Sequence, residues 1–135
     1  MSGMLEPPYG PRDLSGMAIH IEGAPRQIEG ALERMIASPW KAPNPAPDLL
    51  ASGAMGGSAL PADLVAAHYA DRLPHPILAT RDYHWPAWVS SNSLAVLSSY
   101  SGTTEETLAL YREAAARRIP RVALSTGGTL GEWCD

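Results

Sequence analysis

The residues best suited to chemistry lie between Leu94 and Thr107, in the stretch LAVLSSYSGTTEET. An apolar run ends here in small hydroxyl residues and a glycine, and helix-forming residues follow, which predicts a strand, a tight loop and a helix. Ser99, Ser101 and Thr104 supply hydroxyl groups beside the first turn of that helix, where backbone N–H groups lack intrahelical partners. Such a site suits an anion. No lysine or arginine lies in the loop, so we predict a small phosphomonoester held mostly by neutral donors.

The start of this helix carries a capping signal. Thr103 is followed three residues later by Glu106, which predicts a capping box, and Glu105 and Glu106 suit the positive end of the helix dipole. An ordinary helix cap followed by a solvated loop is the alternative interpretation of the same residues.

A second loop of similar type comes earlier in the chain. The apolar run at 48–52 leads into GAMGGS at 53–58, and residues 59–72 have a helical pattern with Leu60 and Leu64 on the expected inner side. A P-loop needs a lysine after its last glycine, and the dinucleotide fingerprint needs G-x-G-x-x-G. The sequence supplies neither, so both nucleotide-binding interpretations are weak.

Two further apolar runs, at 76–80 and 121–125, complete a set of four that alternates with helical or irregular segments. This alternation predicts an α/β fold with a doubly wound, flavodoxin-like parallel sheet of order 2-1-3-4. Ligands bind such sheets beyond the carboxyl ends of the strands at the switch point. The first and third strands are neighbours there, so we expect the two hydroxyl-rich loops to converge on one crevice.

The remaining segments divide the chain further. We predict a loose N-terminal arm at 1–24 and an amphipathic helix with a proline-rich connector at 25–47, because residues 28, 32, 35 and 36 share one helical face. We also expect a local pair between Arg81 and Asp82, and an exposed Trp133.

Composition limits the class of protein. The 135 residues have the length of one domain, and a net charge of −4 with a pI near 5.5 provides no basic surface for nucleic acid or acidic membrane. The sequence has neither an apolar run of spanning length nor a secretory leader, so we expect a cytoplasmic protein. Cys134 is the only cysteine, and the four histidines lack ligand spacing, so no metal or other cofactor is expected.

Four motifs in order, AMGGSAL at 54–60, RDY at 81–83, SYSGTTEET at 99–107 and STGGTL at 125–130, resemble the sugar isomerase (SIS) domain. Their spacing is similar to the N-terminal part of the bifunctional phosphoglucose/phosphomannose isomerases. The resemblance implies that residues 48–135 form a partial SIS domain, incomplete at the C-terminus, whose loops bind the phosphate of a hexose phosphate. Matching positions assign this binding to the following residues: Gly56, Gly57, Ser58, Ser99, Ser101 and Thr104.

Two positions depart from the family pattern, which has glycine where Ala54 stands and asparagine where Thr103 stands. The resemblance also implies a second domain and an isomerisation in which a carboxylate moves a proton between C2 and C1 through an enediolate. The acid, base and cationic residues of the family come after the position of Asp135, so we assign no catalytic residue. Glu105 and Glu106 are better explained by the helix dipole.

Three hypotheses follow. The chain is the N-terminal portion of a sugar-phosphate isomerase, inactive alone; or a stand-alone module that senses a phosphosugar; or a remnant without binding. We expect hexose phosphate as ligand, and a homodimer or a completing C-terminal segment as partner, because the fourth strand would leave an exposed apolar sheet edge.

Overall fold

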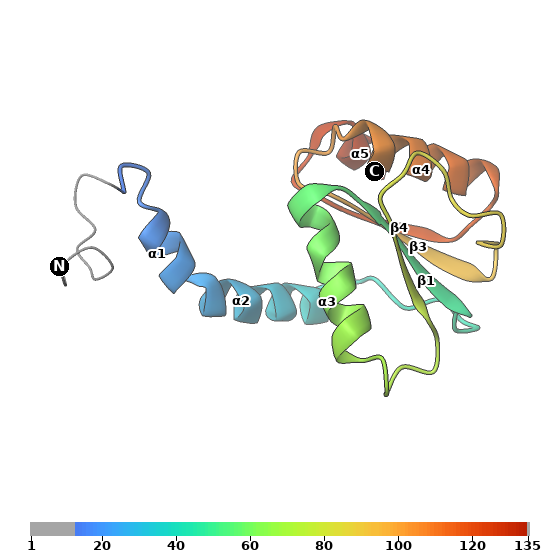
Figure 1. The fold of residues 1–135 in the computed structure, drawn as a ribbon, viewed down its shortest axis with the longest axis horizontal. Helices are drawn as coiled ribbons and strands as arrows, with labels where there is room; N and C mark the ends of the chain where they lie inside the picture. Colours follow the sequence, from blue (N-terminus) through green and yellow to red (C-terminus); the bar gives the residue numbers. More distant parts are fainter. Residues whose placement is uncertain (1–12, 135) are drawn as a thin grey trace. The chain divides into compact units, whose positions relative to one another are not determined.

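The computed structural model describes residues 13–134, and the part of the predicted arm at 1–12 lies outside them. Two helices come first, α1 (Met17–Glu22) and α2 (Ala24–Ala37), and the chain divides into two compact units after Lys41 (Figure 1). The helix α1 lies within the predicted arm at 1–24. The Asp13 carboxylate accepts the N–H groups of Met17 at 2.7 Å and Ala18 at 2.9 Å, which have no partners within the helix. The predicted domain boundaries stay a prediction.

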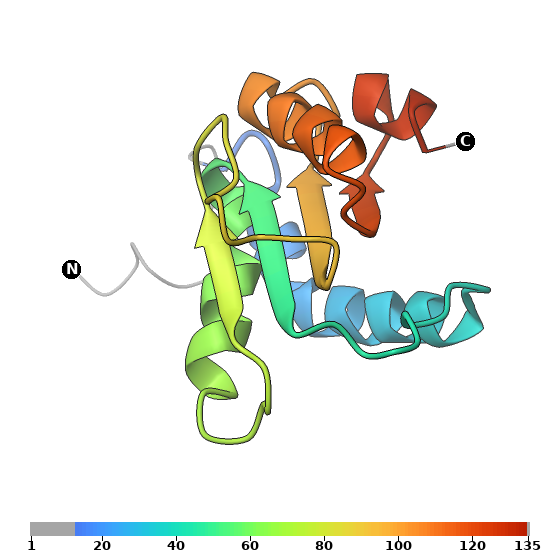
Figure 2. The ribbon, with the colours of Figure 1, turned by 90° about the vertical axis from the view of Figure 1, so that its right-hand side faces the viewer.

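Four parallel strands form one sheet in the second unit, with the order β2-β1-β3-β4. The arrows of Figure 2 all point the same way. This is the predicted α/β architecture with the predicted order, and each strand coincides with an apolar run. The strands are β1 (Leu49–Ala54), β2 (Ile77–Thr80), β3 (Ser93–Ser99) and β4 (Arg121–Ser125).

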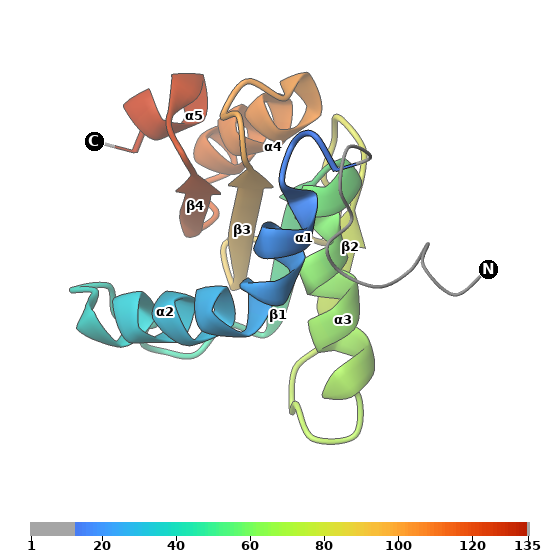
Figure 3. The same ribbon diagram turned by 90° about the vertical axis from the view of Figure 1, so that its left-hand side faces the viewer.

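Helices cover both faces of the sheet. The helix α3 (Leu60–His68) follows a short 3₁₀ turn, η2 (Gly56–Ala59), and lies on one face (Figure 3). The helix α4 (Glu105–Ala116) lies on the other face, and the short helix α5 (Gly128–Glu132) follows β4. The predicted inner side of α3 is wrong for Leu60 and Leu64, which are 54% and 59% exposed. No residue of α3 is buried.

The core lies between the sheet and α4. Leu97 and Leu110 are fully buried, and Leu130 anchors α5 in the same cluster. Gly53 lets β1 approach α4, because a Cβ atom there would lie 2.7 Å from a methyl carbon of Leu110. The close contact between strand and helix therefore depends on a missing side chain.

The connection from β2 to β3, residues 81–92, has no regular helix and packs against α4 and the residue that follows it. Arg117, the residue directly after α4, holds it by donating to the carbonyl groups of Pro86 at 3.2 Å and Ala87 at 3.0 Å. The Trp85 indole Nε1 donates to the carbonyl of Leu110 at 2.8 Å. The prediction of an exposed Trp133 is wrong: its ring is half-buried against the core.

Candidate functional site

The tips of β1 and β3 lie side by side at the carboxyl edge of the sheet, because Ala54 pairs with Ser98 in parallel register. The η2 turn leaves β1 at this edge, and residues 99–104, which we call the β3 loop, leave β3. The turn also contacts β3. The sheet therefore brings both loops with predicted site residues to one edge.

The η2 turn offers exposed backbone. Gly56 has φ of +52°, a conformation that side chains rarely adopt, and both Gly56 and Gly57 are exposed. A Cβ atom at either glycine would meet nothing within 4 Å. Ser58 is half-buried, and its N–H donates to the carbonyl of Met55 at 3.1 Å. The open space in front of the two glycines leaves room for a ligand to approach the main chain.

The hydroxyl groups of the β3 loop bond mainly to one another. Ser99 is 2% exposed, its Oγ lies 2.8 Å from Thr104 Oγ1, and it accepts the N–H of Gly102 at 3.1 Å. Ser101 is exposed, and its Oγ accepts the Thr103 N–H at 3.3 Å and hydroxyl at 3.1 Å. The buried Ser99 hydroxyl thus holds the β3 loop together, whereas the Ser101 side chain is exposed to solvent.

The predicted capping box is wrong. The residue at the N-cap of α4 is Thr104, with no side-chain cap bond, and the helix begins at Glu105. The reason is competition, because the Thr103 hydroxyl bonds to Ser101 and the Thr104 hydroxyl bonds to Ser99. Neither threonine caps the first turn of α4, so its N–H groups at the carboxyl edge are without a side-chain cap.

A third segment, which sequence reasoning did not assign to the site, contacts the β3 loop. Residues 125–128, which we call the β4 turn, pack against it so closely that a Cβ atom on Gly102 would lie 1.8 Å from the carbonyl oxygen of Gly127. Both glycines have positive φ, +69° and +146°. The sequence signal for this contact was the pair of glycines, Gly127 and Gly128, in the STGGTL motif.

Charged groups lie beside this edge, after β2 and in the first turns of α3 and α4. Arg81, directly after β2, pairs with Asp63 in the first turn of α3, so the predicted pair with Asp82 is wrong. The carboxylate of Asp82 instead accepts the N–H of Tyr83 at 2.6 Å. The negative charge of Glu106 raises the pKa of the Tyr83 phenol, with smaller contributions from desolvation and Glu105.

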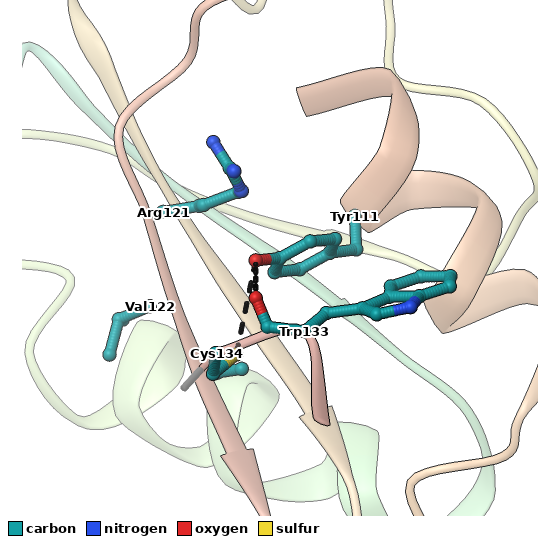
Figure 4. A pocket seen from close by; sticks show the side chains of 6 residues that line it. Tyr111, Arg121, Val122, Trp133 and Cys134 are labelled. Atoms are coloured by element: carbon teal, nitrogen blue, oxygen red, sulfur yellow. Dashed lines mark hydrogen bonds between the residues drawn. The ribbon is translucent and has the colours of Figure 1, made fainter. Parts of the chain in front are cut away.

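A hollow with an aromatic lining lies elsewhere. A cavity of about 420 Å³ beside β4 is lined by six residues, Tyr111, Arg121, Val122, Ala123, Trp133 and Cys134 (Figure 4). The Tyr111 hydroxyl donates to the carbonyl of Trp133 at 2.8 Å and closes one wall. None of the six predicted site residues lines this cavity. Within residues 13–134 no three metal-ligating side chains gather in one place.

Comparison with known proteins shows which proteins this chain is similar to. It is 42% identical over 81 residues to the bifunctional phosphoglucose/phosphomannose isomerase of Caldicellulosiruptor bescii, covering 60% of this chain and 24% of that protein. It is 40% identical over 106 residues to the Pyrobaculum aerophilum protein of the same name, covering 78% of this chain and 31% of that protein. The chain is similar to these isomerases.

The similarity extends to a Thermoplasma acidophilum protein of the same name, at 36% identity over 78 residues. The chain spans between about a quarter and a third of the length of these relatives. No protein-family model matches the chain. The relationship to sugar-phosphate isomerases therefore depends on these pairwise similarities.

Proposed function

We propose that this chain binds the phosphate of a hexose phosphate and forms the N-terminal portion of an aldose–ketose sugar-phosphate isomerase. The observation that carries the proposal is the register of β1 and β3, which brings the η2 turn and the β3 loop to one sheet edge. Ligands of open parallel sheets bind at this edge. Similarity to proteins named bifunctional phosphoglucose/phosphomannose isomerase supports the choice of ligand.

In this proposal neutral donors hold the phosphate. The backbone of Gly56 and Gly57 and the hydroxyl of Ser58 contribute from the η2 turn, and Ser101 and Thr104 contribute from the β3 loop. The N–H groups at the start of α4 add the positive end of a helix dipole. Ser99 acts mainly by holding the loop, because its buried hydroxyl already bonds to Thr104.

We also propose that the chain does not isomerise the sugar by itself. A general base must lie within hydrogen-bond reach of the proton it moves. Glu105 and Glu106, which follow the β3 loop, lie in the first turn of α4. The helix dipole accounts for acidic residues at this position. The chain therefore supplies phosphate binding without a base that we can name.

The expected partners and location stay predictions. The strand β4 forms one edge of the sheet, and Leu124 on it is 56% exposed, so we expect association through this edge. Sedimentation at increasing concentration tests this expectation. Among residues 13–134, no helix combines the length and apolar character that a bilayer crossing requires.

Calorimetric titration tests the proposed function. We expect glucose 6-phosphate and fructose 6-phosphate to bind, and unphosphorylated glucose not to bind. Ser101→Ala should weaken binding, because it removes an exposed donor of the β3 loop. Ser91→Ala is the matched control, since Ser91 is exposed but precedes β3 at the opposite edge.

A coupled isomerase assay on the same samples should record no turnover. Absence of binding by the unaltered chain, or equal binding by the Ser101 and Ser91 variants, would contradict the assigned site. Binding with turnover would contradict the claim that the chain is inactive alone.

A further inference from the structure

Thr126 of the β4 turn makes two bonds to one carbonyl group of the β3 loop. Its hydroxyl donates to the carbonyl oxygen of Tyr100 at 2.6 Å, and its N–H donates to the same oxygen at 3.2 Å. The Tyr100 carbonyl therefore points toward β4, and the bond from a side chain adds to the bond from the main chain.

The direction of this carbonyl decides the direction of the next N–H group. The peptide between Tyr100 and Ser101 is trans and planar, so the Ser101 N–H points opposite to the Tyr100 carbonyl. Because β3 lies between β4 and β1, the Ser101 N–H points to the side of β1, where the η2 turn lies. It donates to no acceptor within residues 13–134.

The rest of the β4 turn restricts movement of the β3 loop. A Cβ atom on Gly128, which has φ of +64°, would lie 2.4 Å from the carbonyl oxygen of Ser101. The N–H of Leu130 donates to the carbonyl of Gly102 at 2.9 Å, and the Leu130 side chain is fully buried. The core thus fixes α5, and α5 with the β4 turn fixes the backbone of Ser101 and Gly102.

We propose that the β4 turn is a positioning element of the phosphate site and that Thr126 is its positioning residue, which aims the unpaired Ser101 N–H at the phosphate. This inference depends on the proposed function. Thr126 touches no ligand in this arrangement. It acts through the Tyr100–Ser101 peptide, so its hydroxyl matters for binding even though it is exposed and lies on the far side of β3 from the η2 turn.

Two pairs of variants of the full chain test the proposal, with inorganic phosphate and glucose 6-phosphate as probes. Thr126→Val removes the hydroxyl donor and keeps the shape, whereas Thr126→Ser keeps the donor. Gly128→Ala forces a Cβ atom against Ser101, whereas Gly131→Ala, in the same helix α5, adds a Cβ atom that meets nothing within 4 Å. Titration calorimetry measures Kd, and amide NMR follows the Ser101 N–H during phosphate addition.

We expect Thr126→Val to raise the Kd of both probes roughly fivefold, which is the change expected from the loss of one ordinary hydrogen bond. The same variant should reduce the phosphate-induced shift of the Ser101 amide. Thr126→Ser should restore both readouts, and Gly131→Ala should leave them unchanged. Gly128→Ala should weaken binding more than Thr126→Val does. If it fails to fold, the threonine pair decides.

Two results would overturn the inference. Tight binding by folded Thr126→Val, with an unaltered Ser101 amide shift, would refute the positioning role while leaving the proposed function intact. Lack of binding by the unaltered chain would refute the proposed function and this inference with it.

Discussion

The hydroxyl groups of Ser99 and Thr104 lie 2.8 Å apart and join the two ends of the β3 loop. Ser99→Ala would remove this bond and the bond from the Gly102 N–H, in a position that is 2% exposed. We expect the free energy of unfolding to fall by about 1 kcal/mol, measured by urea denaturation. The exposed Ser91→Ala should change it by less than about 0.5 kcal/mol. Equal stability of the two variants would mean that the bond contributes nothing to folding.

Gly102 occupies a position where no side chain fits. Its φ is +69°, and a Cβ atom would lie 1.8 Å from the Gly127 carbonyl oxygen. We expect Gly102→Ala to lower the free energy of unfolding by at least about 2 kcal/mol, because the β3 loop and the β4 turn must separate. Gly57→Ala is the control, since its Cβ atom would meet nothing within 4 Å. Equal unfolding midpoints for these two variants would contradict the close packing.

Thr107 contains a buried hydroxyl without a hydrogen-bond partner among the described residues. Valine has nearly the same shape and no polar atom to desolvate. We therefore expect Thr107→Val to raise the free energy of unfolding by about 1 kcal/mol. Thr103→Val is the comparison, because the exposed Thr103 hydroxyl donates to Ser101 and its loss should not stabilise the protein. A destabilised Thr107→Val in thermal or urea unfolding would reveal a partner for this hydroxyl.

Glu113 links α4 to the crossover connection and should make stability depend on acid pH. Burial raises the pKa of its carboxyl, but hydrogen bonds from Arg117, the Trp85 N–H and His84 lower it more, so the pKa lies below its ordinary value of 4.5. A carboxyl with a lowered folded-state pKa contributes stability above its unfolded pKa, and this contribution is lost as pH falls through the folded-state value.

We therefore expect Glu113→Gln to be less stable than the unaltered chain at pH 6 to 7, with a difference that shrinks below about pH 4.5. Urea denaturation across this range measures it. Glu132→Gln is the control, because Glu132 is exposed and forms no ion pair within residues 13–134. A difference that stays constant down to pH 3 would show that the Glu113 charge is not involved.

Much of the architecture could be predicted from residue patterns. Short apolar runs such as 94–97 mark buried strands, and the preference for right-handed crossovers leaves few ways to order four parallel strands. The two strand tips that carry the η2 turn and the β3 loop follow directly from that order. The cap of α4 was predicted less well, because several hydroxyl groups of the β3 loop can bond to one another. The Thr103 hydroxyl bonds to Ser101 and not to an N–H group of the first helical turn.

The amino-acid sequence by itself determined the strands, their order and the edge at which the hydroxyl-rich loops meet, because burial and crossover handedness depend on short-range pattern. Only the tertiary structure decided that the β4 turn holds the β3 loop. Gly102 and Gly127 are far apart in the chain, and their backbones come into contact only after β3 and β4 have paired. The direction of the Ser101 N–H follows from the bonds between Thr126 and the Tyr100 carbonyl, since the C=O and N–H groups of a trans peptide point in opposite directions.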